Sequence, residues 1–165
     1  AKNLLVFAIT VFILISLVIF FIYRRIKITL AVILTMISEA VITLAIAALI
    51  NWNLDAPSIA GIIAGMGTGV NDQIVILDEA TNKRGTLKDR IKSALFIIVG
   101  AFLTIIAAMI PLFWAGAGML KGFALTTILG VSVGILITRP AFSEIVKNIM
   151  KNSSRLHKIY KDIFL

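Results

Sequence analysis

Five long apolar runs limit what this 165-residue chain can fold into. They cover residues 4–23, 28–50, 57–77, 93–113 and 122–138. About 20 consecutive apolar residues form a helix that can cross the ~30 Å hydrocarbon core of a bilayer. Hydrophobic residues make up 60% of the chain and charged residues only 15%, which excludes an ordinary soluble globular domain. The sequence therefore predicts an all-α polytopic membrane protein with five transmembrane helices.

The lysines and arginines are distributed unevenly over the connections between these runs. Fourteen of the sixteen follow the first, third or fifth run, and only Lys2 and Lys121 fall on the other side. Cytoplasmic segments of membrane proteins carry an excess of Lys and Arg, so we expect the N-terminus outside and the C-terminus in the cytoplasm. Trp52 and Trp114 fall in the two outside connections, where interfacial aromatics are common.

The same distribution defines the predicted domains. Residues 1–140 form the transmembrane domain, and residues 141–165 form a basic cytoplasmic tail. We assign the net charge of +8 to this topology and to contact with anionic membrane lipids, and expect no nucleic-acid partner. Nothing in residues 1–3 explains how a chain start reaches the outside. We therefore expect an upstream span and an exterior domain; the alternative is a five-span protein whose short N-terminus is translocated by its first run.

The third run is unusually rich in glycine. On an α-helix, Gly61, Gly65 and Gly69 share a stripe about 100° wide with Asp72. The fifth run carries a matching stripe of Gly122, Thr126, Gly130 and Gly134. Small residues let membrane helices approach closely, so we expect the third and fifth runs to pack through these two stripes. The simpler alternative for any single glycine is that it only permits packing.

Two carboxylates lie inside predicted spans. Asp72 is about two thirds of the way along the third run, and Glu39 is near the middle of the second. Intramembrane carboxylates are costly and often mark proton relays, so both are candidates for proton or ion coupling. The alternative for Asp72 is a neutral, hydrogen-bonded residue that fixes helix packing. We expect Arg139 and Lys121 to lie at helix ends and reach the interface, so that any cation for this site comes from another chain.

Enzyme chemistry has little support in the sequence. The chain has no cysteine, and its single histidine, His157, lies in the basic tail. No cluster with metal-ligand spacing is present, and no nucleophile is spaced with a base. We therefore expect no catalytic residue, no metal and no cofactor.

Several motifs resemble the SecD family, whose members are accessory subunits of the Sec protein-translocation machinery. The segment G-I-I-A-G-M-G-T-G-V-N-D-Q over residues 61–73 resembles the fourth transmembrane helix of that family, in a form more similar to archaeal members. Residues 116–126 resemble the stretch that leads into the family's last helix, and residues 85–94 resemble its cytoplasmic loop. The matches cover about residues 55–140.

The resemblance implies half of an RND-type pseudo-symmetric bundle in the cell membrane, which pairs with SecF and uses the proton-motive force to assist protein export. It implies further partners: the Sec translocon channel and the unfolded secretory polypeptide. The family's intramembrane acid aligns with Asn71, and here Asp72 follows it. Either Asp72 takes that role from the next position, or the coupling differs. Two other functions stay open: a fragment of an RND-type small-molecule or lipid exporter, and a non-transporting membrane scaffold.

Overall fold

The structure is a computed structural model that describes residues 2–24, 26–82, 85–116 and 118–164. The side chains of residues 2–5, 7–8, 22–23 and 153–164 are not part of this description. Three basic residues of the topology prediction, Arg25, Lys83 and Arg84, lie outside the described residues, and the side chain of His157 is also not described.

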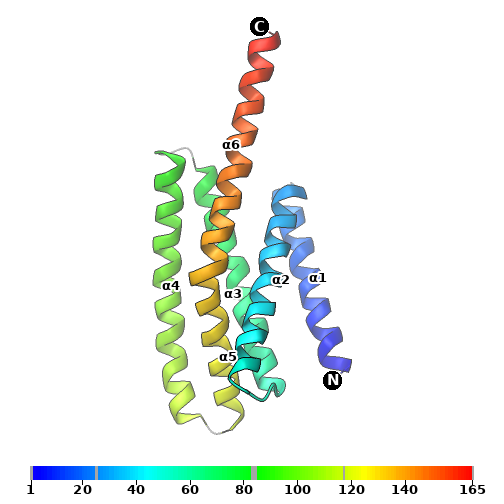
Figure 1. Cartoon of the computed structure of the whole chain (residues 1–165), viewed down its shortest axis with the longest axis vertical. Coiled ribbons are helices and arrows are strands. Elements are labelled where there is room, and N and C mark those ends of the chain that lie inside the picture. The colour runs from blue at the N-terminus through cyan, green and yellow to red at the C-terminus, as the bar shows by residue number, and fades with distance from the viewer. Residues whose placement is uncertain (1, 25, 83–84, 117, 165) are drawn as a thin grey trace.

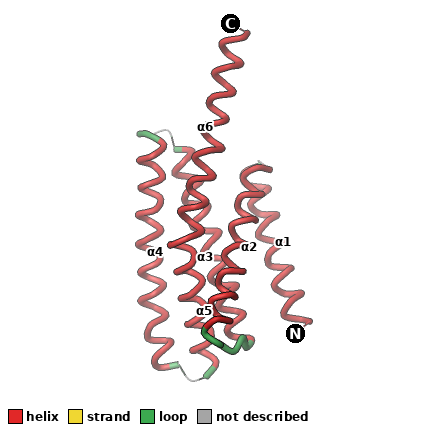
Figure 2. The backbone as a smooth tube through the Cα atoms, viewed as in Figure 1, coloured by secondary structure: helices red, strands yellow, loops and turns green. Residues whose placement is uncertain are grey.

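The described chain is a bundle of long helices without a strand (Figure 1, Figure 2). The helices are α1 (Lys2–Tyr23), α2 (Ile26–Leu49), α3 (Ala56–Thr81), α4 (Leu87–Ala115), α5 (Met119–Val133), the π-helical turn η1 (Gly134–Thr138) and α6 (Arg139–Phe164). The N-terminus lies at the same end of the bundle as the α2–α3 and α4–α5 connections, and α6 extends beyond the opposite end (Figure 1).

Four of the described helical stretches are long and apolar enough to cross a membrane: α2, α3, α4 and the continuous stretch Met119–Asn152. Helix α1 contributes a shorter apolar stretch, Ile9–Phe21. Large apolar side chains such as Phe96, Leu34 and Leu103 point outward, which is expected for helices that face lipid. The chain is therefore an all-α, multi-pass membrane protein, as the sequence predicted. Which end of the bundle faces the cytoplasm stays a prediction.

Two prolines, Pro111 and Pro140, lie inside helical stretches. Helix α4 continues past Pro111 to Ala115, and the fifth run continues through Pro140 into α6. A proline removes one backbone donor and its ring crowds the preceding turn. Membrane helices tolerate this because neighbouring helices and local changes of helical pitch satisfy the freed groups. At Pro140 that local change is η1, the wide turn that comes directly before it.

Side-chain caps mark the starts of α3 and α4, directly after the connections that precede these helices. The Asp55 carboxylate accepts from the backbone N–H of Ser58 at 2.9 Å, and Pro57 occupies the first turn of α3. A capping motif begins α4, in which the Thr86 hydroxyl accepts from the backbone N–H of Asp89 at 3.3 Å. These caps fix where α3 and α4 enter the bundle.

Helices α3 and α5 cross at small residues. A Cβ atom on Gly65 would lie 3.6 Å from the Cα atom of Gly130, so the two backbones are in near contact. One turn away, the Thr127 hydroxyl donates to the Gly61 carbonyl at 3.3 Å. The Thr126 hydroxyl donates to the Ser58 carbonyl at 2.8 Å. Close backbone approach and interhelical hydrogen bonds are how membrane helices associate where lipid removes the hydrophobic driving force.

Candidate functional site

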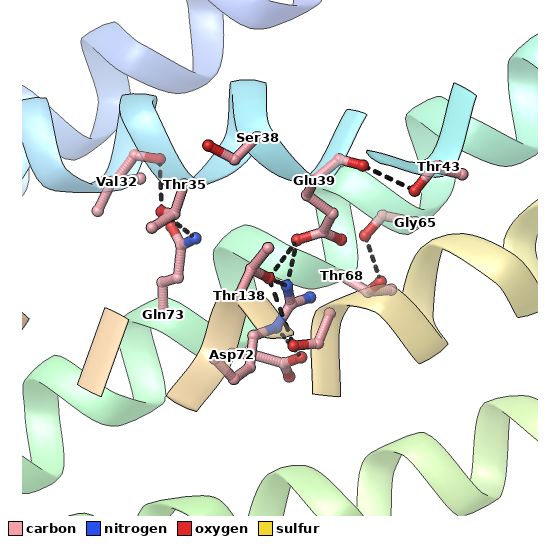
Figure 3. Close-up of polar contacts among 12 residues, drawn as sticks. Val32, Thr35, Ser38, Glu39, Thr43, Gly65, Thr68, Asp72, Gln73 and Thr138 are labelled. Atoms are coloured by element: carbon pink, nitrogen blue, oxygen red, sulfur yellow. Dashed lines mark hydrogen bonds and ion pairs between the residues drawn. The ribbon is translucent and has the colours of Figure 1, made fainter. Parts of the chain in front are cut away.

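Among the described side chains, one buried cation joins three helices in the middle of the bundle. Arg139, the first residue of α6, is 1% exposed. Its Nη1 atom forms an ion pair with Oε2 of Glu39 on α2, and its Nε atom donates to Oδ2 of Asp72 on α3 at 3.0 Å. Figure 3 shows the Glu39 and Asp72 side chains converging from their two helices on this point. Two of the predicted site residues, Glu39 and Asp72, are therefore brought together by a third that we did not predict.

Thr138 completes this ion cluster of Glu39, Asp72, Thr138 and Arg139. The Thr138 hydroxyl lies 3.0 Å from Glu39 Oε2 and accepts from Arg139 Nη1 at 2.6 Å. Thr138 is the last residue of η1, and Arg139 comes directly after it. The backbone N–H of Arg139 donates to the Gly134 carbonyl five residues earlier, which is the hydrogen bond of a π-helical turn. Single π-turns are frequent at functional sites, because the extra residue re-aims the side chains that follow.

Two glycines make the space that the guanidinium occupies. A Cβ atom on Gly69 would lie 2.8 Å from Arg139 Nη2 and 3.2 Å from both Glu39 carboxylate oxygens. A Cβ atom on Gly134 would lie 2.7 Å from Arg139 Cζ. We expected both glycines to serve the α3–α5 contact, as Gly61, Gly65, Gly122 and Gly130 do. Instead, Gly69 and Gly134 line the ion cluster, so this end of each small-residue stripe accommodates a charge.

The expectation that Arg139 lies at a helix end and reaches the interface was wrong. Arg139 lies within the Met119–Asn152 stretch and is buried, because Pro140 does not end the helix. The cation for this site is therefore in the same chain as both carboxylates. The sequence pattern gave no signal for this position: on a regular α-helix Arg139 would lie about 140° around the axis from Gly134. The π-helical turn η1 brings the two residues to the same side.

The two carboxylates differ in their surroundings. Glu39 is 2% exposed, whereas Asp72 is 21% exposed at the side of the cluster. Asn71, which the sequence resemblance aligns with the family acid, is exposed. Adjacent helical residues are turned about 100° from each other, so only one of Asn71 and Asp72 can face Arg139. The structure directs Asp72 toward it.

A second polar contact lies one turn from the ion cluster. The Gln73 amide donates to the Thr35 hydroxyl at 2.8 Å, and both residues are buried between α2 and α3 (Figure 3). The sequence analysis missed Gln73. The available signal was its spacing, since Gln73 is four residues from Gly69 on α3 just as Thr35 is four residues from Glu39 on α2.

The residues that the structure describes contain no group of three or more His, Asp or Glu side chains that could hold a metal ion. The ion cluster pairs its two carboxylates with a guanidinium instead. Its chemistry is that of a buried ion pair whose members can exchange partners or take up a proton.

Comparison with known proteins places this chain in a family. Residues 1–152 match the family model described as protein export membrane protein SecD/SecF, C-terminal. The chain belongs to the SecD/SecF protein-export membrane family. That family consists of export proteins of the membrane, not of enzymes, and the chain is accordingly a multi-pass membrane protein.

Individual relatives point to the SecD branch of the SecD/SecF family. The protein-export membrane protein SecD of Methanocaldococcus jannaschii is 55% identical over 130 residues, which are 78% of this chain and 33% of that protein. SecD of Thermococcus gammatolerans is 47% identical over 157 residues, or 90% of this chain and 30% of that protein. The protein translocase subunit SecD of Synechocystis is 36% identical over 103 residues, or 58% of this chain and 22% of that protein. The chain thus spans about a third or less of the length of these relatives.

Proposed function

We propose that this chain is the membrane part of a SecD-type accessory subunit that assists protein export by using the proton-motive force together with SecF. The observation that carries the proposal is the ion cluster. Two carboxylates and one guanidinium leave one uncompensated negative charge when all three are ionised. A charge at membrane depth is costly, and one proton neutralises it. The cluster is therefore suited to take up and release a proton.

Asp72 is the carboxylate that we assign to proton exchange. Glu39 Oε2 receives both Arg139 Nη1 and the Thr138 hydroxyl, so the guanidinium is held mainly by α2 and η1. Asp72 has one contact with Arg139 and is 21% exposed. A proton on Asp72 weakens that one contact and leaves the Glu39–Arg139 pair intact. Helix α3 is then free to shift relative to α2 and α6, which is the movement that we propose is passed to an exterior domain.

The exposed face of α3 supports a second membrane subunit of SecF type as partner. Asn71 and Gly67 are exposed on it, next to the partly exposed Asp72. An amide in contact with lipid has no hydrogen-bond partner and costs several kcal/mol. A second helical subunit that covers this face would satisfy Asn71 and screen Asp72 from lipid. The Sec channel and the secretory polypeptide are partners that we propose for the whole assembly, and anionic lipid for the basic tail.

The test is secretion in membrane vesicles that contain the full-length protein and its SecF partner under an imposed proton gradient. We expect Asp72→Asn to abolish the gradient-dependent part of export, because an amide carries no exchangeable charge. Glu39→Gln should reduce it. Glu144→Gln is the matched control, since Glu144 is exposed and pairs with Lys147 at the surface. Normal gradient-dependent export by both Asp72→Asn and Glu39→Gln would refute proton coupling at this site and favour a scaffold role.

A further inference from the structure

A cavity of about 310 Å³ lies between α1, α2 and α3, apart from the ion cluster. Its ten lining side chains are all apolar: four come from α1, two from α2 and four from α3. Among them are Ala40, the residue after Glu39 on α2, and Met66, the residue after Gly65 on α3. The cavity is therefore walled by three helices and offers no polar side chain to a ligand.

Helix α1 forms the outer wall of this cavity. Near its end, Ile19 is buried against the core cluster that also contains Ile28 of α2. From that end the two helices diverge toward the N-terminus of α1, as Figure 1 shows. The cavity-lining residues of α1 lie between Ile9 and Ile15, before Ile19 in the chain. The cavity thus lies where α1 separates from the rest of the bundle.

The lining of the cavity favours hydrocarbon over water. An apolar cavity of about 150 Å³ lined by Leu, Ile and Phe stays dry and binds benzene. The cavity between α1, α2 and α3 is about twice as large and has the same kind of lining. Two of its walls, α2 and α3, are long and apolar enough to cross a membrane, so the medium around it is lipid.

The cavity is continuous with the lipid-facing surface of the bundle. Ile9 and Leu44 line the cavity and also belong to the exposed large apolar side chains. On the same two helices, Ile13 and Val41 are exposed as well. A hydrocarbon chain of the bilayer that covers these residues can therefore extend into the cavity without passing a polar side chain.

We propose that the hydrocarbon chain of a membrane lipid occupies this cavity. A transmembrane helix is about 10–12 Å wide with its side chains, whereas a compact cavity of this volume is only about 8 Å across. An extended protein segment would bring backbone N–H and C=O groups that need partners at membrane depth. The lining side chains supply none. A lipid chain is thin and has no polar group to satisfy.

The bound lipid chain has a structural role. It contacts α1, α2 and α3 at once and supplies packing contacts that the diverging helices do not make with one another. It thereby holds α1 against the two helices that carry Glu39 and Asp72. The inference rests on the lining of the cavity and on its continuity with the lipid-facing surface, and holds whether or not the protein uses a proton gradient.

The test is photocross-linking of the full-length protein with its SecF partner in nanodiscs. The nanodiscs contain a phospholipid that carries a diazirine near the end of one acyl chain, and labelled residues are mapped by mass spectrometry. We expect Met66, which lines the cavity, to be labelled well above Ile76, which lies on the same helix and is 0% exposed. Leu103 of α4 is exposed and serves as the internal reference for general contact with lipid.

Two variants separate the cavity from the open bilayer. Ala40→Phe places a ring in the cavity and should reduce the labelling of Met66 to that of Ile76, while Leu103 stays labelled. Val41→Phe is the matched control, because it adds the same ring to the next residue, which is exposed and does not line the cavity. It should leave the labelling of Met66 unchanged.

Three results would overturn the assignment. The first is labelling of Met66 no higher than that of Ile76 in the unaltered protein, which decides the question even where Ala40→Phe does not fold. The second is labelling of Met66 that persists unchanged in Ala40→Phe. The third is a density map of the same nanodisc complex in which a protein segment fills the cavity.

Discussion

Replacing Arg139 by Met should strongly destabilise the protein. The change leaves Glu39, which is 2% exposed, as an unpaired charge among apolar side chains. Breaking a buried ion pair by removing one partner costs about 3–5 kcal/mol. The change also removes the contact with Asp72, which is 21% exposed. For a domain of this size, the loss corresponds to a fall of about 6–20 °C in the melting temperature.

A second substitution separates lost charge pairing from lost packing. In Arg139→Met with Glu39→Gln, the buried unpaired charge of Glu39 is gone and an amide takes its place, while the partly exposed Asp72 remains. We therefore expect the double variant to melt at a higher temperature than Arg139→Met alone. If Arg139 matters only through the volume of its side chain, Glu39→Gln should bring no recovery.

The assay is thermal unfolding of the full-length protein in detergent micelles. Lys147→Met is the matched control on the same helix, since Lys147 is partly exposed and pairs with the exposed Glu144 at 2.8 Å. Exposed pairs contribute about 0–1 kcal/mol, so this variant should melt close to the unaltered protein. A melting temperature of Arg139→Met equal to that of Lys147→Met would refute the buried ion cluster as described.

Three further predictions concern glycines and a cap. Gly69→Ala should lower the free energy of unfolding by about 1–3 kcal/mol, because the new methyl group overpacks against Arg139. Gly67→Ala is the control and should be neutral or stabilising, because its Cβ meets nothing within 4 Å. Equal melting temperatures of the two variants would contradict the glycine-lined site. Gly65→Leu should separate α3 from α5 and reduce the yield of folded protein, while Gly65→Ala, with a Cβ contact of 3.6 Å, should fold; normal yield of Gly65→Leu would contradict the close crossing. Hydrogen bonds from the Ser58 side chain and backbone lower the pKa of Asp55 below its ordinary value of 3.8. Because the pKa of Asp55 is lower in the folded than in the unfolded protein, the capping stabilisation is fully present above the ordinary pKa of 3.8 and is lost as the pH falls through the folded pKa. Asp55→Asn should therefore flatten the pH dependence of the melting temperature in this acidic range. An unchanged profile would refute the assignment.

The fold was largely predictable because its cause is local. A run of about twenty apolar residues has few alternatives to a membrane helix, since every backbone polar group must be satisfied within the segment. The capping residues Asp55 and Thr86 act within three residues of their own positions, so their helix starts can be read from the sequence. The spacing of the glycines also follows from one helix at a time.

The ion cluster was only partly predictable, because it depends on contacts between distant segments. Glu39 and Arg139 are 100 positions apart, and no periodicity within one helix relates them. Pro140 contributed to the wrong prediction for Arg139. A proline usually ends a helix in a soluble protein, so its position predicted that Arg139 lies at a helix end and is solvated. In this bundle the π-helical turn η1 accommodates the proline, so the helix continues and Arg139 is buried.

The displacement of the acid by one residue has a geometric consequence. The sequence resemblance aligns the family acid with Asn71, and a one-residue step turns a side chain by about 100° around its helix. In this chain Asn71 faces outward and Asp72 meets Arg139 at 3.0 Å. Because Arg139, Glu39 and Asp72 all belong to the described chain, this cluster needs no cation from another subunit to form. A partner subunit that covers the Asn71 face would then control access to Asp72 instead of supplying its counter-charge.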